Sequence, residues 1–460
     1  MGGEMNRTIK MAACACCAGL MLAALPAWAQ DAALQAPAAA PTATVNKGDT
    51  AWMMTSTILV LLMIVPGLAL FYGGLTRAKN MLSTMTQIGA VAALAMLIWV
   101  MWGYTMAFGD GGGAFVAGFD KAFLRGVTPA STSATFTPGT AIPEYVFVCF
   151  QMTFAAITIA LVLGSVVERM KFSAVMAFAA VWLTIVYFPV AHMVWAGNGL
   201  FFTGNLFGSG SPGALDFAGG TVVHINAGVS ALVAALMLGK RIGFPSERMP
   251  PHSLTMTGIG TGLLWVGWFG FNAGSALEAN GSAGLAMINT FVATASAGLF
   301  WMLAERVNGH KGSALGFCSG IVAGLVAVTP AAGNAGPFGA IVLGAVASII
   351  CYYMVTVVKP KLGYDDSLDA FGIHGIGGMI GAVGTGIVYS PALGGPGGEA
   401  WRMGPQLFTQ VVAVLVTIGW ATLGTMISIA VAKALTGLRV SEEVEREGLD
   451  LGEHGERAYN

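Results

Sequence analysis

The stretch that decides the fold is Asp-Phe-Ala-Gly-Gly-Thr-Val-Val-His-Ile-Asn-Ala-Gly, from Asp216 to Gly228. It opens with a carboxylate and leads into an apolar segment that runs from Ala227 to Leu238. We expect the stretch to be helical from Asp216 onward, which would place His224 about two helical turns inside it, roughly 12 Å at about 1.5 Å per residue. Ionisable groups at such a depth in a membrane are costly and usually face a pathway or an interior cavity. The stretch therefore predicts a membrane helix with a functional histidine.

A second histidine, His374, stands in a comparable setting, Asp-Ala-Phe-Gly-Ile-His-Gly-Ile-Gly-Gly from Asp369 to Gly378. Our hypothesis is that His224 and His374 line one conduit. If they are adjacent, we expect a neutral pair in which one ring donates a proton to the other, with the outer nitrogens free for a substrate. The alternative is that each histidine only hydrogen-bonds neighbouring helices, as polar side chains in bundles often do. A metal site is disfavoured, since no cysteine cluster or further central histidine joins them.

Composition places the whole chain in a membrane. Of 460 residues, 56% are hydrophobic and only 9% are charged, whereas charged residues make up about a quarter of soluble domains. The 65 glycines agree, because small residues let transmembrane helices approach closely. No basic cluster indicates a nucleic-acid partner.

The chain contains eleven apolar segments of about 20 residues or more, each long enough to span a membrane. They cover roughly 51–74, 81–108, 143–166, 173–195, 219–239, 254–274, 284–304, 314–332, 338–358, 371–390 and 405–435.

The termini and loop charges predict the orientation. Residues 1–29 resemble a secretory signal peptide, residues 30–49 are expected to be a disordered periplasmic N-terminus, residues 50–436 the membrane domain and residues 437–460 a cytoplasmic tail. Lys and Arg favour cytoplasmic loops. The loops predicted to be cytoplasmic hold Arg77, Lys79, Arg169, Lys171, Lys240, Arg241, Arg248, Arg306, Lys311, Lys359 and Lys361, and those predicted to be outside hold only Lys121, Arg125 and Arg402.

An inverted repeat is expected between spans one to five and spans six to ten. The fifth and tenth spans each carry a histidine after an acidic residue, Asp216 before His224 and Asp369 before His374. Inverted repeats place substrate sites near the membrane midplane at the repeat interface. The fold class is therefore all-α and polytopic, with eleven transmembrane helices and both histidines near one central site.

Other side chains have both a functional and a structural interpretation. Asp216 stands where it could cap the fifth helix, and its charge could also favour a cation at the outer mouth. Aromatic rings near outer helix ends mark lipid interfaces or, grouped, bind small cations at about 0.5 to 2 kcal/mol each. Acidic residues before the tenth span are interpreted as a solvated loop that also caps this helix, and Glu168 with Arg169 as a structural pair. The acidic group is Asp365, Asp366 and Asp369.

Over about residues 50–460 the chain resembles the bacterial Amt branch of the Amt/Mep/Rh superfamily of ammonium transporters. The motifs that carry the resemblance are Phe71 to Leu75 (FYGGL), Glu168 to Ser173 (ERMKFS), Ala191 to Trp195 (AHMVW), Asp216 to Ala227, Gly267 to Ser275 (GWFGFNAGS) and Phe371 to Gly375 (FGIHG). As a set they are highly specific.

The resemblance implies a role for each site residue. Phe150, Trp195 and Ser275 would recruit ammonium, Phe154 and Phe271 would stack as a gate, and His224 and His374 would be the twin histidines of the pore. Asp216 matches an aspartate that transport requires in the family.

The resemblance also implies a homotrimer in the bacterial inner membrane, with a pore within each protomer. We expect no cofactor and no metal. The run Gly437 to Glu443 is similar to tails that couple subunits and bind a PII-type signalling protein.

Ammonium can cross a narrow apolar pore only after it loses its proton, because burying an unpaired charge is very costly. We therefore expect recruitment, deprotonation, passage of ammonia along the histidines and reprotonation inside, with potassium excluded. Three alternatives remain: an ammonium sensor, an Rh-type gas channel, and an intramembrane enzyme using Asp216 and His224. The enzyme is disfavoured because no Ser or Cys nucleophile motif accompanies them.

Overall fold

The computed structural model describes residues 43–459. Within this part eleven helical segments are long and apolar enough to cross a membrane, which confirms the predicted fold class. They are Lys47–Leu75, Ala78–Phe108, Glu144–Ser165, Phe172–Trp195, Gly220–Leu238, Leu254–Gly274, Gly281–Val307, Ala314–Ala331, Pro337–Leu362, Phe371–Val388 and Met403–Thr436. The predicted signal peptide lies outside the described residues.

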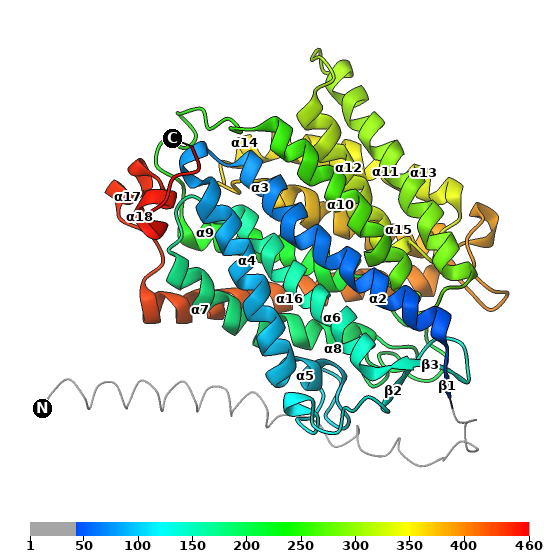
Figure 1. Ribbon diagram of the computed structural model, residues 1–460. Helices are drawn as coiled ribbons and strands as arrows, with labels where there is room; N and C mark the ends of the chain where they lie inside the picture. Colours follow the sequence, from blue (N-terminus) through cyan, green and yellow to red (C-terminus); the bar gives the residue numbers. More distant parts are fainter. Residues whose placement is uncertain (1–42, 460) are drawn as a thin grey trace, which may run out of the picture. The chain divides into compact units, whose positions relative to one another are not determined.

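The described residues form seventeen α-helices: α2 to α16 build the spans, together with short 3-10 and π-helical turns, and α17 and α18 belong to the C-terminal tail (Figure 1). The α-helices are α2 (Lys47–Leu62), α3 (Ala69–Leu75), α4 (Met81–Ile98), α5 (Tyr104–Phe108), α6 (Glu144–Val162), α7 (Phe172–Trp182), α8 (Phe188–Trp195), α9 (Asn226–Leu238), α10 (Leu254–Gly274), α11 (Gly281–Val307), α12 (Ala314–Val328), α13 (Pro337–Tyr353), α14 (Lys359–Leu362), α15 (Ile376–Val388), α16 (Met403–Thr436), α17 (Glu442–Glu447) and α18 (Leu449–His454). Caps explain several bounds. Asn280, for example, accepts the N–H groups of Ser282 and Ala283, so α11 begins ahead of its predicted start.

Both pore histidines lie in π-helical turns, Gly220–Ile225 before α9 and Phe371–Gly375 before α15. Such turns are rare and occur frequently at functional sites. Because the fifth span begins at Gly220, His224 lies only about one turn inside it. The expected depth of two turns is therefore wrong, since Asp216 and the residues that follow it form a loop.

The two halves of the chain repeat the same features in the order that an inverted repeat requires. The third and eighth spans both end in a 3-10 turn, Leu163–Ser165 and Thr329–Ala331. The loop before each histidine span then bonds to the other half: Leu368 N–H donates to Gly164 O at 2.9 Å, and Phe217 N–H donates to Pro330 O at 3.2 Å.

A small sheet and the C-terminal tail lie at opposite ends of the bundle, and we call these the strand end and the tail end (Figure 1). At the strand end β3 (Thr140–Pro143) pairs in parallel with β1 (Thr44–Val45) and antiparallel with β2 (Thr132–Ala134). The expectation of disorder up to residue 49 is therefore wrong for its last residues, which form β1 and the start of α2. The rest of that segment lies outside the described residues.

The tail folds back onto the starts of two spans. The Asp450 carboxylate accepts the N–H groups of Leu82 and Ser83 at 3.1 and 2.8 Å, at the start of α4. The Glu453 carboxylate accepts the N–H of Phe172 at 2.8 Å, at the start of α7. Carboxylates in these positions satisfy N–H groups that have no partner within their own helix. The tail is thus an ordered part of the tail end.

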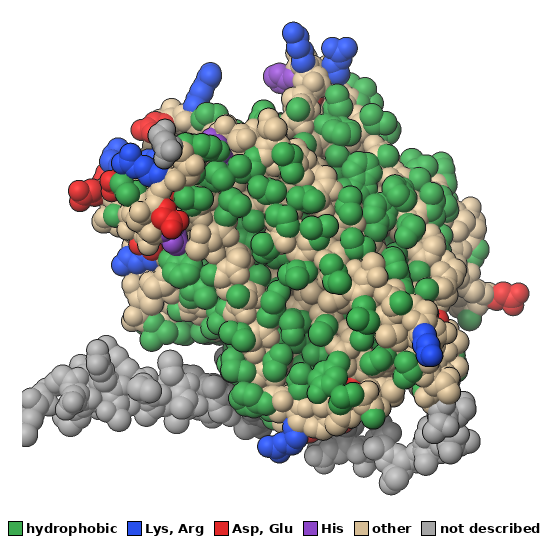
Figure 2. Space-filling view, viewed as in Figure 1, with side chains coloured by type: hydrophobic (Ala, Val, Ile, Leu, Met, Phe, Trp, Pro, Cys, Tyr) green, Lys and Arg blue, Asp and Glu red, His purple; other side chains and the backbone are tan. Residues whose placement is uncertain are grey.

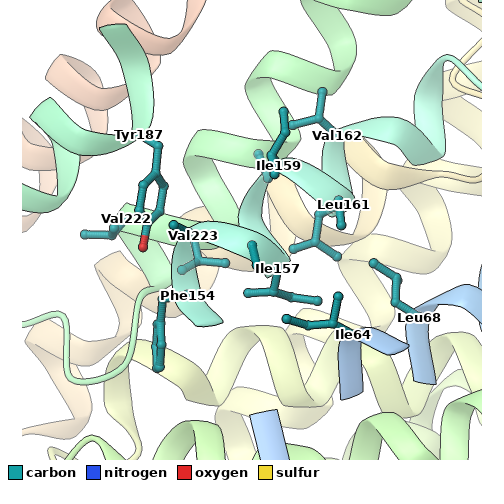
Figure 3. Close-up of a cluster of buried hydrophobic side chains, with 14 of the residues drawn as sticks. Ile64, Leu68, Phe154, Ile157, Ile159, Leu161, Val162, Tyr187, Val222 and Val223 are labelled. Atoms are coloured by element: carbon teal, nitrogen blue, oxygen red, sulfur yellow. The ribbon is translucent and has the colours of Figure 1, made fainter. Parts of the chain in front are cut away.

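The surface between the two ends is apolar. Figure 2 shows hydrophobic side chains across the middle of one face, with the charged side chains toward the ends. Large side chains such as Ile58 on α2, Leu97 on α4 and Leu299 on α11 are more than 60% exposed, as expected of a surface that faces lipid. Inside, Ile64, Leu68, Ile157 and Leu161 form part of the buried apolar core (Figure 3).

Candidate functional site: a closed pore

A cavity of about 690 Å³ opens at the strand end. Its walls include Phe150 and Phe154 from α6, Trp195 from the end of α8, Asp216, and Ser275 directly after α10. The structure thus brings together the residues expected to recruit ammonium. The Ser275 hydroxyl donates to Phe271 O at 2.8 Å, which leaves its oxygen free to accept a hydrogen bond.

Aromatic rings close the floor of this cavity. Phe154 and Phe271 stack with their centroids 4.2 Å apart and their planes 16° apart. Phe150 and Trp195 approach Phe154 edge-on, at 4.9 and 5.8 Å. Phe154 and Phe271 are both fully buried, so in this conformation they separate the cavity from the space beneath them.

Beneath the stacked rings lies a second cavity of only about 10 Å³, about the volume that one water molecule requires. The polar groups on its wall come from His224, His374 and Trp268, and the rest of the wall is apolar. The apolar residues are Met63, Leu68, Phe71, Ile157, Leu161, Leu264, Phe271 and Val322. Figure 3 shows Ile157, Leu161 and Leu68 close together. This lining offers hydrogen bonds at the histidines and no compensation for a permanent charge.

The two histidines meet through their Nδ1 atoms, which lie 3.3 Å apart. Both rings are almost fully buried, and the Nε2 atom of His224 has no hydrogen-bond partner within the described chain. Two Nδ1 atoms at this distance can share only one proton, so one ring donates and the other accepts. The expected pairing is therefore present.

Glycine and tryptophan hold the histidine pair in place. A Cβ atom on Gly228 would lie 2.1 Å from the backbone nitrogen of Gly375, so only glycine allows the fifth and tenth spans to cross this closely. Trp268 stacks on His224 with the ring centroids 5.4 Å apart, and its indole N–H donates to the Thr329 hydroxyl at 2.9 Å.

Asp216 serves as a cap in this structure. Its two carboxylate oxygens accept the N–H groups of Gly219, Gly220, Thr221 and Val222. Burial raises the pKa of the Asp216 carboxyl to about 6, although these four N–H groups favour its charged form. The backbone carbonyl of Asp216 also accepts the indole N–H of Trp195 at 2.9 Å. The predicted capping role of Asp216 is thus confirmed. Through these bonds Asp216 connects Trp195, in the wall of the large cavity, to the start of the span that carries His224.

In the inverted repeat, the residue of the second half that corresponds to Asp216 is Asp366. The expectation that Asp369 corresponds to Asp216 is therefore wrong. Asp366 accepts the N–H groups of Ala370 and Phe371 at 3.1 and 2.8 Å. It precedes His374 by the same eight positions that separate Asp216 from His224. Asp369 instead adopts φ 60° and pairs with Lys359 at 2.6 Å. The equal spacing from each aspartate to its histidine was the signal in the sequence that could have identified Asp366.

Two of the three carboxylates before the tenth span are buried, contrary to the solvated loop expected there. Asp365 and Asp366 are 2% and 0% exposed. The expected ion pair between Glu168 and Arg169 is wrong. Glu168 pairs instead with Arg77 at 2.9 Å and with Arg241 at 3.0 Å.

Arg241 also binds Asp365 at 2.8 Å. Burial acts to raise the pKa of the Glu168 carboxyl, but Arg241 and Arg77 outweigh it and hold this pKa below its ordinary value. Arg169 bonds backbone carbonyls, among them Gly239 O and Asp365 O, each at 2.8 Å.

Sequence reasoning missed Gln410, which lies in the apolar α16. Its carboxamide accepts the N–H of Leu215 at 2.7 Å and donates to Leu215 O and Ala382 O at 2.9 and 2.7 Å. Gln410 thus joins the loop that carries Asp216 to α15, the helix that follows His374. A glutamine within a long apolar span is a polar group at membrane depth, and this signal was available in the sequence.

Comparison with known proteins gives one answer. A profile described as the Ammonium Transporter Family matches residues 51–459. An ammonium transporter of Aquifex aeolicus is 48% identical over 419 residues, which cover 91% of this chain and 95% of that protein. An ammonium transporter of Bacillus subtilis is 43% identical over 416 residues, covering 90% and 98%.

Solved structures agree with the sequence comparison. Saccharomyces cerevisiae Mep2 matches with a TM-score of 0.76 and 34% identity, over 86% of this chain and 91% of that one. A structure titled Sensor Amt Protein matches with a TM-score of 0.77 and 29% identity, over 88% and 98%. The pore geometry and these likenesses agree: this chain belongs to the ammonium transporter family, as a multi-pass membrane transporter and not an enzyme.

Proposed function

We propose that the protein recruits ammonium in the large cavity, removes its proton near the stacked phenylalanines, and conducts ammonia past His224 and His374. The observation that carries this proposal is the wall of the small cavity, which is apolar except for ring N–H groups and nitrogens. A potassium ion cannot lose its charge, and an unpaired buried charge costs several kcal/mol or more. Ammonia is neutral and can exchange hydrogen bonds with the histidine nitrogens. Potassium is therefore excluded.

Recruitment rests on aromatic faces and one hydroxyl. Phe150 and Trp195 offer π faces, and each such face contributes about 0.5 to 2 kcal/mol to binding a small cation. The Ser275 oxygen accepts a hydrogen bond from the cation. Phe154 and Phe271 act as the gate, since ammonium must pass between rings whose centroids are 4.2 Å apart.

Asp216 contributes its charge and its position. Its oxygens are already engaged by four backbone N–H groups, so it favours the cation in the cavity through the electrostatic field. It also fixes the start of the span that carries His224. Transfer of the proton to water in the large cavity, which opens at the strand end, leaves ammonia at the entrance of the small cavity.

Replacement of Trp195 tests the recruitment site. Trp195→Leu should raise KM for ammonium, because one π face and the bond to Asp216 O are lost. Trp102→Leu is the matched control, since the Trp102 indole donates to Thr184 at 3.1 Å and does not line the cavity. An unchanged KM in purified, folded Trp195→Leu protein, measured by uptake in proteoliposomes, would refute recruitment at this site.

We further propose an orientation and an assembly. The strand end faces the periplasm and the tail end the cytoplasm of a bacterial inner membrane, after cleavage of the leader 1–29. Lys and Arg in the loops of the tail end support this orientation.

We also propose that three protomers form a homotrimer and that the tail from residue 437 onward binds a PII-type signalling protein. The mass of the detergent-solubilised assembly tests the trimer, and co-purification of a PII-type protein with the full chain but not with a chain ending at residue 436 tests the partner.

A further inference from the structure

Part of the wall of the large cavity is not used by the transport proposal. Tyr104, Lys121 and Glu144 line it. Glu144 begins α6 and stands six positions before Phe150 on the same helix, so the two residues are about 9 Å apart along the helix axis. A charge on this wall thus acts on any cation that approaches Phe150.

The three side chains form a site with the chemistry of an ammonium receptor. The Lys121 ammonium group lies 2.8 Å from Glu144 Oε1. The Tyr104 hydroxyl donates to the same oxygen at 2.8 Å, and the Lys121 nitrogen lies 5.9 Å from the centroid of the Tyr104 ring. A carboxylate and an aromatic ring together attract a small monovalent cation. Here that cation is the head group of the chain's own lysine.

The backbone around Lys121 is held, so the lysine is presented to Glu144 from a fixed position. The Lys121 N–H donates to the Thr105 hydroxyl at 3.0 Å, and this hydroxyl donates to Gly118 O at 3.0 Å. Ala117 N–H also donates to Met106 O at 2.9 Å. The side chain of Glu144 is only 7% exposed and that of Lys121 is 24% exposed. The lysine thus covers a carboxylate that would otherwise face the cavity without a positively charged partner.

We propose that Lys121 is a tethered ammonium group that fills a second site for small monovalent cations and closes it to potassium and ammonium from solution. A buried carboxylate without a partner is a strong attractor for a counter-ion. Potassium bound there would neutralise Glu144 and so remove the attraction of this carboxylate for ammonium that approaches Phe150, about 9 Å away. With Lys121 in place, the cavity passes ammonium to Phe150 without retaining other cations. Lys121 is thereby a specificity-determining residue outside the pore.

The inference rests on ammonium transport, the activity of the family, and not on the recruitment roles of Trp195 and Ser275. Its test is the dependence of KM for ammonium on external potassium in proteoliposomes, at constant ionic strength balanced with N-methylglucamine. Four proteins are compared: the parent, Lys121→Met, Lys121→Arg, and the double variant Lys121→Met with Glu144→Gln. Lys121→Arg keeps the cation, and the double variant removes both charges.

We expect the KM of Lys121→Met to rise by about twofold or more when potassium replaces N-methylglucamine. The KM of the parent, of Lys121→Arg and of the double variant should not depend on potassium. Crystals of Lys121→Met soaked in thallium(I) should show anomalous density at Glu144, and those of the double variant should not. A potassium-independent KM in folded Lys121→Met, or absence of thallium at Glu144, would overturn the proposal. A failure of Trp195→Leu to change KM would refute recruitment at Trp195 and leave this result standing.

Discussion

His374 Nδ1 lies 3.3 Å from His224 Nδ1, and the two rings are nearly parallel at 21°. Each histidine comes from a different half of the inverted repeat, so the pair forms at the interface between the halves. Because the two Nδ1 atoms share one proton, they bind each other and leave the Nε2 atoms for other partners. The pair is the polar centre of an otherwise apolar pore.

Replacing either histidine by alanine should abolish ammonium transport or admit potassium. Alanine removes the hydrogen-bonding nitrogens and leaves space that water can enter. The free-energy barrier that an ion meets in the pore is therefore altered. His310→Ala is the matched control, because His310 lies exposed in the loop between α11 and α12. Uptake of ammonium and of potassium into proteoliposomes is the measurement. Variants that both move ammonium like the parent and still exclude potassium would contradict the role of the pair.

Asp216→Asn should lower stability and transport more than Asp366→Asn does. The amide nitrogen cannot accept hydrogen bonds, and it would face two of the four N–H groups that Asp216 now binds. Each buried N–H left without a partner costs about 1–3 kcal/mol. Asp366 accepts two N–H groups, so its loss should be smaller. Thermal unfolding in detergent and uptake are measured on the same preparations, and an equal Tm for Asp216→Asn and the parent would disprove the capping account.

Arg241→Met should destabilise the tail end at neutral pH by about 3–5 kcal/mol, because it leaves Glu168 and Asp365 buried without this partner. Burial acts to raise the pKa of Asp365, but the hydrogen bonds and charge of Arg241 lower it overall. For Glu168 the charges of Arg241 and Arg77 likewise lower the pKa despite burial. Carboxylates with a lowered folded-state pKa stabilise the fold above their ordinary pKa, about 4. That stabilisation is lost as the pH falls through the folded-state pKa values.

The difference in Tm between the parent and Arg241→Met should therefore shrink as the pH falls below about 4. The control is Arg446→Met, which removes an exposed pair with Glu442 and should not change Tm measurably. A Tm difference for Arg241→Met that stays constant from neutral pH to pH 3 would mean that ionised Glu168 and Asp365 are not the cause.

Asp450→Ala should loosen the tail and the start of α4. The two N–H groups that Asp450 now binds would lose their acceptor, and loss of such a cap typically costs about 0.5–2 kcal/mol. Hydrogen exchange of residues 442–459 and of the first turn of α4 should accelerate. Glu443→Ala, an exposed tail residue, should leave exchange unchanged. Parent-like protection in Asp450→Ala would show that the tail is held by its other contacts alone.

The spans and the residues of the pore could be predicted from the sequence because their signals are local or repeated. Long apolar runs predicted all eleven spans, and two histidines in matching settings indicated one site. The contacts of the loop residues were harder to predict from the sequence. Glu168 and Arg169 are adjacent in sequence, yet Glu168 adopts φ 70° and its partners Arg77 and Arg241 come from distant segments. Ion pairs between loops depend on tertiary structure, which hydropathy does not report.

Spacing and capping explain the remaining differences. Asp369 is nearer to His374 in sequence, but Asp366 is the residue whose carboxylate meets the free N–H groups at the start of the span. The depth of His224 was overestimated because Asp216 to Gly219 are loop residues, held by the cap and by Phe217 N–H on Pro330 O. The role of Gln410 depends on contacts with two other segments and needed the structure.

The most direct test of the central claim is simultaneous measurement of ammonium and potassium entry into proteoliposomes of the purified parent protein. Passage as ammonia predicts saturable ammonium uptake with no potassium entry above that of protein-free liposomes, even when potassium is in large excess. Potassium entry through the protein that saturates and competes with ammonium would show that a permanent cation passes His224 and His374, and would contradict deprotonation as the basis of selectivity.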